Sequence, residues 1–420
     1  MFLLCLSVLA AAWPLDTAAA LAKQLEPTYR WFHQHPELSL QEQETAQRLA
    51  HELEARGAEV HTGIGGTGVM AILRNRARPK GPVVLYRADM DALPVTEATG
   101  LPYASKHVGV MHACGHDLHM TIALGVIDAL RRHEDRWSGS VLFIGQPAEE
   151  IGQGARAIMA DPRFGKILKK TGKPVLALAL HDEASPVGAV SMRGGFAWAN
   201  VDMVDVTFYG KGGHGARPHQ TIDPVLMGSQ YVTAIQSIVS RRLSPNNSAV
   251  VTVGSFQAGR KHNIISGEAK LLITVRSYGD EQRNFILGQL KEIAGAVAKA
   301  HGAPKKPSVS WGNEYTRSVW NDPKWNERLM VEFRTLLGPN NVHTHDRFFI
   351  GEDFGAYGPR LGIPSVLYML GAANAKRYRA AKDPASLPGL HSERWAPDTV
   401  PALTYGIATM TRAIATASAN

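Results

Sequence analysis

Cysteine is scarce in this sequence: only Cys5 and Cys114 carry a thiol among 420 residues. A chain with two thiols is not one of the small secreted scaffolds that depend on several disulfides. Cys5 lies in an N-terminal apolar run, Phe2 to Ala12. If that run is cleaved off, Cys114 is the only thiol left, and no intrachain disulfide can form.

Long apolar runs are lacking after this N-terminal one, so we expect no membrane span. Small residues at Ala10 and Ala12, or at Ala18 and Ala20, suit cleavage by signal peptidase, although no positive charges precede the run. We therefore expect a signal peptide within residues 1–20 and an exported protein, periplasmic or secreted. The alternative is a cytoplasmic protein whose first helix begins with this apolar run.

A concentrated basic region is lacking too, although the net charge is +8. The densest group of basic residues, Arg74 to Lys80, flanks an expected turn, and aromatic residues do not alternate with it. Nucleic-acid binding is therefore not expected. With 45% hydrophobic and 20% charged residues, the composition is that of a globular protein, and the length suggests two domains.

Three short apolar runs, 83–86, 140–145 and 175–180, have the pattern of strands buried on both faces. Each run ends in side chains that can bind a metal or move a proton: Asp89 and Asp91, Glu149 and Glu150, and His181. Open α/β sheets place their sites at the carboxyl ends of such strands. We therefore expect these side chains to share one site.

Between the first two runs, the stretch from Met111 to His119 holds three His, one Cys and one Asp. Cys114 and His116 are separated by one Gly, so both side chains can reach one centre from a turn. Thiolate and imidazole suit zinc or a similar transition metal. Read alone, the stretch can also be a His-rich polar loop at the start of a helix.

Gly63 to Gly68 matches the G-x-G-x-x-G pattern of dinucleotide-binding proteins, and Asp89 follows about twenty residues later. The segment after it, Val69 to Leu73, has the pattern of a strand, whereas a phosphate loop needs a helix there. We therefore predict a glycine-rich hairpin. A nucleotide-dependent oxidoreductase, which depends on this loop alone, is disfavoured.

The pattern changes near residue 191, where longer runs alternate between apolar and polar residues, as in half-exposed antiparallel strands: 201–209, 249–256 and 268–277. Helical patterns at 223–240 and 280–300 accompany them. We predict an inserted domain over 191–305, and a first domain built from 21–190 and 306–420.

Six motifs occur in order: 87–94 (RADMDALP), 112–117 (HACGHD), 146–150 (QPAEE), 210–216 (GKGGHGA), 261–265 (KHNII) and 351–354 (GEDF). Together they resemble the co-catalytic metallo-amidohydrolase and carboxypeptidase family, in the subgroup of hippurate hydrolases, aminoacylases and indole-acetyl-amino-acid hydrolases. The resemblance covers nearly the whole chain after residue 20. It implies a mixed-sheet α/β catalytic domain of zinc-peptidase type with an inserted α/β sandwich, a lid and dimerisation domain.

The resemblance implies two divalent ions bound by five side chains: Cys114, His116, Glu150, His181 and His391. Zinc, manganese, cobalt and nickel all suit this set, and the thiolate can bridge two ions. His112 and His119 are then expected to be structural or to support the ligands from behind. Asp89 and Asp91 are not ligands in this subgroup, and Asp91 is expected to orient one.

The remaining roles are also implied by the resemblance. Glu149 corresponds to the general base that takes a proton from water. His214 corresponds to a histidine that stabilises the oxyanion in the partner subunit's site, so a homodimer is expected. Asn263 and Arg276 correspond to groups that hold the substrate carboxylate.

We therefore expect a metal-dependent amidohydrolase or metallocarboxypeptidase that cleaves N-acyl amino acids or small peptides with a free carboxylate. Leu118, Met120 and Ser266 depart from the residues common in the family, and two acids follow His181. These departures leave the substrate preference open. The alternative is a non-catalytic metal-binding or ligand-binding protein on the same fold.

Overall fold

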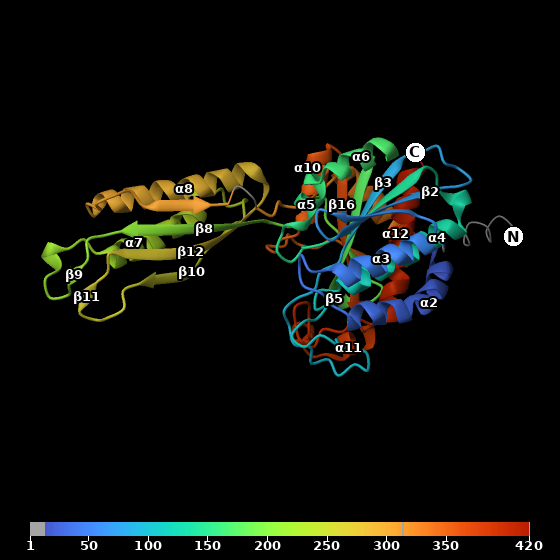
Figure 1. The fold of residues 1–420 in the computed structure, drawn as a ribbon, viewed down its shortest axis with the longest axis horizontal. Coiled ribbons are helices and arrows are strands. Elements are labelled where there is room, and N and C mark those ends of the chain that lie inside the picture. Colours follow the sequence, from blue (N-terminus) through green and yellow to red (C-terminus); the bar gives the residue numbers. More distant parts are fainter. Residues whose placement is uncertain (1–12, 313–314, 420) are drawn as a thin grey trace. The chain divides into compact units, whose positions relative to one another are not determined.

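The computed structural model describes residues 13–312 and 315–419, and its packing divides the chain into two compact units (Figure 1). Unit 1 comprises the chain up to Ala197, Trp320–Asp346 and the chain from Asp353 onwards. Unit 2 comprises Trp198–Val319 and Arg347–Glu352. Unit 2 thus begins and ends later than the inserted segment 191–305 suggested by sequence, and it gains a short second piece.

Unit 1 contains an eight-stranded mixed sheet in the order β1-β2-β4-β3-β5-β16-β6-β15. The strands are β1 (Glu59–Ile64), β2 (Gly68–Arg74), β3 (Val83–Asp89), β4 (Ser140–Gln146), β5 (Leu176–Pro186), β6 (Val190–Ser191), β15 (Val342–His343) and β16 (Ser365–Ala373). The four central strands, β4, β3, β5 and β16, run parallel. Their carboxyl ends therefore meet at one edge of the sheet.

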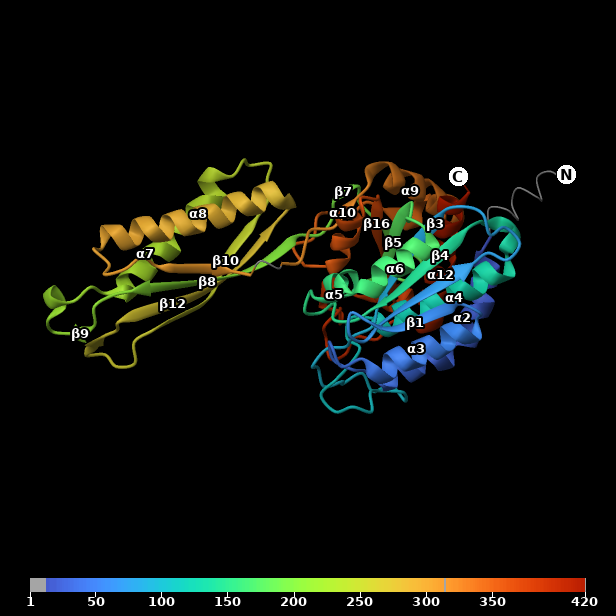
Figure 2. The same ribbon diagram turned by 45° about the horizontal axis from the view of Figure 1, so that its top comes forward.

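Helices cover both faces of this sheet. The helices of unit 1 include α2 (Leu15–Gln34), α3 (Gln43–Ala55), α4 (His116–Arg132), α5 (Gly154–Ala160), α6 (Pro162–Thr171), α9 (Pro323–Leu337), α10 (Tyr357–Leu361), α11 (Ala375–Ala380) and α12 (Thr399–Ser418). Figures 1 and 2 show α2, α3 and α4 together, apart from α5, α6 and α10. Val141 and Phe143 of β4 join the core that packs against the first group. Leu142 and Ile144 point to the other face and are equally buried. This double burial explains the continuous apolar runs of the sequence.

Unit 2 contains an antiparallel sheet in the order β10-β12-β8-β13. Its strands are β8 (Asn200–Tyr209), β10 (Val250–Ala258), β12 (Glu268–Ser277) and β13 (Ser308–Trp311), and helices α7 (Pro224–Ser237) and α8 (Gly279–Ala300) pack on one face. Along β12, exposed and buried residues alternate, as the sequence predicted. A short ribbon pairs β9 (Gly213–His214) with β11 (Ile264–Ile265).

The segment before β1 folds as two helices, α2 and α3, and the Ser39 hydroxyl between them donates to Asp91 at 2.6 Å rather than capping α3. The glycine-rich segment is a hairpin turn between β1 and β2, as predicted.

The expected signal peptide falls largely on residues 1–12, which lie outside the described residues. Helix α2 begins at Leu15, and its Ala18 is buried in the core of unit 1. Cleavage after Ala20 would remove the first turns of α2, whereas cleavage after Ala12 would leave the helix whole. Among the described helices, none is both long and apolar enough to cross a membrane.

Candidate metal centre

The turn before α4 places Cys114 and His116 on either side of Gly115. Gly115 has φ +79° and is the N-cap of α4. A Cβ atom at this position would lie 2.3 Å from Oδ1 of Asp182. Both the left-handed backbone and the close approach of Asp182 therefore require glycine here.

Five predicted ligands converge at the carboxyl edge of the sheet in unit 1. The Cys114 Sγ lies 3.2 Å from Nε2 of His391 and 3.6 Å from Nε2 of His181. Glu150 lies 3.9 Å from Nε2 of His116 and 3.6 Å from Nε2 of His391. Two groups of ligand atoms result, Cys114 with His116 and His181, and Cys114 with Glu150 and His391; within each group the atoms lie within 4.8 Å of one another. Cys114 belongs to both groups, which suits a thiolate shared by two ions.

The donor atoms are oriented as metal ligands need to be. Nδ1 of His116 donates to the Asp91 carbonyl and Nδ1 of His181 to the Asp182 carbonyl, each at 2.8 Å, so both Nε2 atoms present a lone pair. The buried Nε2 of His116 and Oε1 of Glu150 have no hydrogen-bond partner among the described residues. Orphaned polar atoms of this kind fit a bound cation.

The pKa shifts of the candidate ligands also favour a bound cation. Burial and the charge of Glu150 raise the pKa of the Cys114 thiol, and a nearby cation would reverse this effect. Burial lowers the pKa of His181, which keeps it a neutral ligand. Burial likewise opposes protonation of His116, but the charge of Asp89 outweighs it and raises the pKa of His116. A divalent ion in place of that proton would satisfy the same carboxylates.

Asp91 holds the turn that carries Glu149 and Glu150. Its carboxylate accepts the backbone N–H groups of Glu149 at 3.1 Å and of Glu150 at 3.0 Å, besides the Ser39 hydroxyl. Ala148, just before this turn, is buried at φ +52°. A non-glycine residue in the left-handed region is strained, and such strain is common at functional sites.

His391 reaches the centre from the C-terminal loop. Its backbone φ is +65°, and its N–H donates to the Ala113 carbonyl at 2.7 Å. This bond holds the loop beside the Cys114 turn. The His391 side chain is 58% exposed, so this side of the centre is open to solvent.

A buried charged network lies behind the ligands. Nδ1 of His119 lies 2.6 Å from Oδ1 of Asp89, and Arg87 donates to both Asp89 and Asp353. Burial lowers the pKa of His119, but Asp89 and Asp182 raise it to about 9. However, the Asp182 N–H donates to Nε2 of His119 at 2.9 Å, which requires a lone pair there. The geometry therefore favours a neutral ring with its proton on Nδ1.

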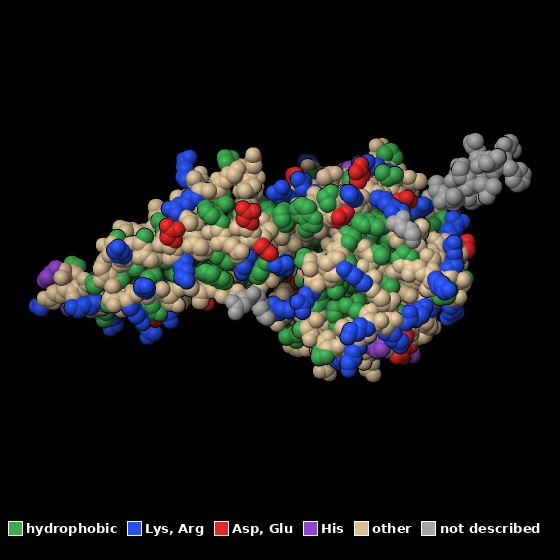
Figure 3. Space-filling model, turned by 90° about the horizontal axis from the view of Figure 1, so that it is seen from above, with side chains coloured by type: hydrophobic (Ala, Val, Ile, Leu, Met, Phe, Trp, Pro, Cys, Tyr) green, Lys and Arg blue, Asp and Glu red, His purple; other side chains and the backbone are tan. Residues whose placement is uncertain are grey.

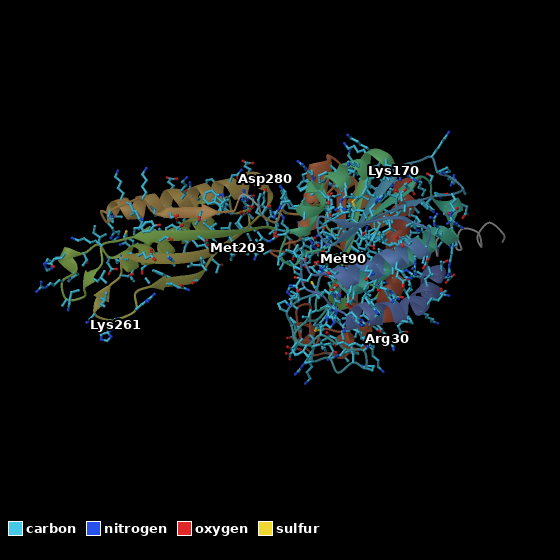
Figure 4. All side chains as sticks on the ribbon, viewed as in Figure 1. Arg30, Met90, Lys170, Met203, Lys261 and Asp280 are labelled. Carbon is cyan, nitrogen blue, oxygen red and sulfur yellow. The ribbon has the colours of Figure 1, made fainter. Side chains whose placement is uncertain are left out.

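The other predicted site residues belong to unit 2. His214 and Ile264 are directly paired across the β9–β11 ribbon, and the Asn263 carbonyl accepts the Gly215 N–H at 2.8 Å. His214 and Asn263 therefore lie side by side. Figure 3 shows His, Lys and Arg side chains gathered at the end of unit 2 that carries this ribbon, and Figure 4 places Lys261 there.

Arg276 lies elsewhere in unit 2, on β12 opposite Val201 of β8 and Val250 of β10. It alternates with buried Val275 and Ser277, so it faces away from α7 and α8. No described residue forms an ion pair or hydrogen bond with its guanidinium. Burial lowers the pKa of Arg276. A half-buried guanidinium without a carboxylate partner is suited to an anionic ligand.

Sequence reasoning treated Asp89, His119 and Asp182 only as neighbours of ligands. Their contacts depend on three elements, β3, α4 and β5, that meet only in the fold. The one local signal was the spacing of His119, three residues after His116, which places both on one face of α4.

Metal-binding side chains clustered at the carboxyl edge of a mixed sheet, with the carboxylate Glu149 next to one of them in the chain, are suited to metal-dependent hydrolysis. Comparison with known proteins agrees. The model of the peptidase family M20/M25/M40 matches residues 85–388. An N-acetylcysteine deacetylase of Bacillus subtilis is 35% identical over 351 residues, which cover 83% of this chain and 88% of the relative.

Other relatives point the same way. An N-acetyldiaminopimelate deacetylase of Shouchella clausii is 36% identical over 343 residues, covering 81% of this chain and 88% of the relative. The crystal structure of the YXEP protein of Bacillus subtilis, a dinuclear metal-binding peptidase, has a TM-score of 0.78 and 29% identity, and covers 95% of this chain and 99% of that one. The chain belongs to peptidase family M20/M25/M40.

Proposed function

We propose that the protein hydrolyses the amide bond of N-acyl amino acids, or of small peptides with a free carboxylate. The observation that supports this proposal most is the convergence of Cys114, His116, Glu150, His181 and His391 beside Glu149. N-acetyl amino acids are the first candidates, because two relatives are named as deacetylases of such compounds. Carboxypeptidase activity on dipeptides is the second.

The five ligands would hold two divalent ions, and zinc, manganese, cobalt and nickel remain candidates. When bound, such ions lower the pKa of water and polarise a carbonyl group. Glu149 takes the proton of the attacking water and delivers it to the leaving amine nitrogen as the C–N bond breaks. Asp91 keeps Glu149 and Glu150 in place through their backbone N–H groups.

Unit 2 would supply substrate recognition. Arg276 and Asn263 lie about a strand length apart within unit 2, so Arg276 of one chain and Asn263 of the second copy of a homodimer would hold the substrate carboxylate, and His214 of that second copy would stabilise the oxyanion. The ten residues of β8 separate the chain crossing at Trp198 from the β9–β11 ribbon, a span of about 30 Å. That span supports action on a partner subunit. We further propose export, with cleavage near Ala12, which N-terminal sequencing of the mature protein would test.

The central test is a substrate panel of N-acetyl, N-benzoyl and dipeptide substrates, with metal-reconstituted protein and mass detection of products. We expect release of a free amino acid from at least one class. Glu149→Gln should keep both metals and lose about 10²- to 10⁴-fold in turnover, since only proton transfer is removed. Unaltered turnover would rule out Glu149 as the base.

Cys114→Ala tests the ligand set independently of catalysis. The variant should bind fewer than two ions per chain, because Cys114 belongs to both ligand groups. Elemental analysis that still finds two ions would overturn the assignment. If wild-type protein binds two ions but releases no product from any substrate, the non-catalytic metal-binding alternative holds.

A further inference from the structure

His119 is buried between two groups on different strands, and both its ring nitrogens are engaged. Nδ1 contacts Oδ1 of Asp89 at 2.6 Å, and Nε2 accepts the Asp182 N–H at 2.9 Å. Oδ1 of Asp182 is 3.2 Å from Nε2 but forms no hydrogen bond. The ring therefore bridges the Asp89 carboxylate, at the end of β3, and the backbone of β5.

The engaged nitrogens exclude His119 itself as a ligand in this arrangement. Its side chain lies near enough to His116 and Asp89, and to His181 and Asp182, to form candidate metal-binding groups. Binding an ion would require the loss of the Asp89 contact or of the Asp182 N–H bond. The family resemblance likewise gives His119 no ligand role, which leaves these contacts without an explanation.

The Asp182 peptide group connects His119 to a ligand. Its N–H donates to His119, and its carbonyl accepts the Nδ1 proton of His181 at 2.8 Å. The position of that carbonyl determines which nitrogen of His181 faces Cys114 and how its ring is turned. At the other end of this series of contacts, Arg87 holds the Asp89 carboxylate in place, because it donates to Asp89 and to Asp353.

We propose that His119 is a positioning residue that orients the ligand His181 through the Asp182 backbone, with Asp89 and Arg87 holding its own ring in the required tautomer. This role also explains why a carboxylate, Asp89, is buried close to the centre although it is not a ligand in the subgroup that the sequence resembles. The proposal rests on the ligand set assigned under the proposed function. It predicts an effect on metal affinity that does not depend on which substrate is cleaved.

Three substitutions separate the two contacts of the ring. His119→Gln places an amide near the Nε2 position and can still accept the Asp182 N–H. His119→Asn places its amide near the Nδ1 position and keeps only the Asp89 contact. His119→Leu removes both. Metal affinity is measured for each variant by calorimetric titration of the metal-free protein with Zn²⁺ and with Mn²⁺, and folding by circular dichroism.

We expect His119→Leu and His119→Asn to lower the affinity for one of the two ions by about 10- to 100-fold. His119→Gln should lower that affinity less. His33→Gln is the matched control. It also removes a buried histidine bound to carboxylates, but His33 contacts Asp117 and Glu97 rather than Asp182. Its metal affinity should stay within about twofold of the wild-type value, even if its thermal stability falls.

Equal affinities in wild-type protein and His119→Leu would overturn the proposal, and so would equal losses in the Asn and Gln variants. If His119→Leu does not fold, the comparison of Asn with Gln decides alone. Failure of the ligand set itself is distinguishable, because Cys114→Ala would then retain both ions, whatever the His119 variants do.

Discussion

At the scale of single residues, Gly115 shows how the backbone sets the ligand geometry. Cys114 and His116 can both point to the centre because the residue between them adopts φ +79°. The absence of a side chain also admits the Asp182 carboxylate, whose atoms lie 2.3 to 2.5 Å from where a Cβ would be. One glycine therefore joins the turn before α4 to the end of β5, which carries His181.

Gly115→Ala should therefore lower both stability and metal affinity. The left-handed backbone alone costs an alanine about 1–2 kcal/mol, and displacement of the Asp182 carboxylate adds to this cost. Gly109→Ala is a matched control, because Gly109 has φ +82° and no atom within 4 Å of the place a Cβ would occupy. Urea unfolding and metal titration compare the two variants. Equal losses of stability, with metal affinity unchanged in both, would contradict the role given to Gly115.

Single residues also mark the limit of sequence reasoning at this site. Cys114 and His116 were expected to reach one centre because a single Gly separates them, and the structure groups their ligand atoms. The role of His119 could not be predicted, because it depends on the N–H of Asp182, a backbone group that any residue supplies. His112, which contributed to the same dense motif, is buried, and neither ring nitrogen has a hydrogen-bond partner in the described chain.

At the scale of elements, the ends of the buried strands could be predicted from the sequence, whereas the contacts of the segment between α2 and α3 could not. Continuous apolar runs identified β3, β4 and β5, since strands buried on both faces need them. Between α2 and α3, however, Ser39 and Glu42 carry the signature of a helix cap but serve tertiary contacts. Ser39 binds Asp91, and Glu42 accepts the Ala148 N–H and the Thr67 hydroxyl.

Helix α2 is joined to the first turn of α4 through a buried ion pair. Nδ1 of His33 lies 2.7 Å from Asp117, the residue after His116, and Nε2 lies 3.3 Å from Glu97. Glu97 also accepts the Ser105 N–H at 2.6 Å, which ties down the loop that follows β3. Burial alone would lower the pKa of His33, but the two carboxylates outweigh it and raise the pKa to about 9.

This pair predicts a pH-dependent contribution to stability. A histidine whose folded-state pKa is raised stabilises the fold fully below its unfolded pKa of about 6.5, and this contribution is lost as pH rises through about 9. His33→Gln should therefore lower the free energy of unfolding of the metal-free protein by up to roughly 3 kcal/mol near pH 6, and by much less above pH 9. Urea unfolding across this range measures the difference. A loss that is the same at pH 6 and pH 9.5 would show that His33 is not charged in the fold.

At the scale of the whole molecule, the residues proposed for bond cleavage and those proposed for substrate recognition lie in different units. The five ligands and Glu149 belong to unit 1, whereas His214, Asn263 and Arg276 belong to unit 2. The change from continuous to alternating apolar patterns near residue 191 revealed two domains. Their boundaries were harder to predict, because the second crossing at 346–353 lies in a stretch without a pattern change.

Subunit mixing tests whether His214 acts on a partner's site. Glu149→Gln and His214→Gln should each be nearly inactive alone. In a mixed dimer, the site of the His214→Gln chain has its own Glu149 and the partner's intact His214, so remixing should restore about a quarter of wild-type activity. Mixing Glu149→Gln with Cys114→Ala is the control, because both changes affect unit 1 and no mixed dimer has a complete site. If mixed dimers form, as shown by affinity tags, but the first pair recovers no more activity than the control, His214 does not act between subunits.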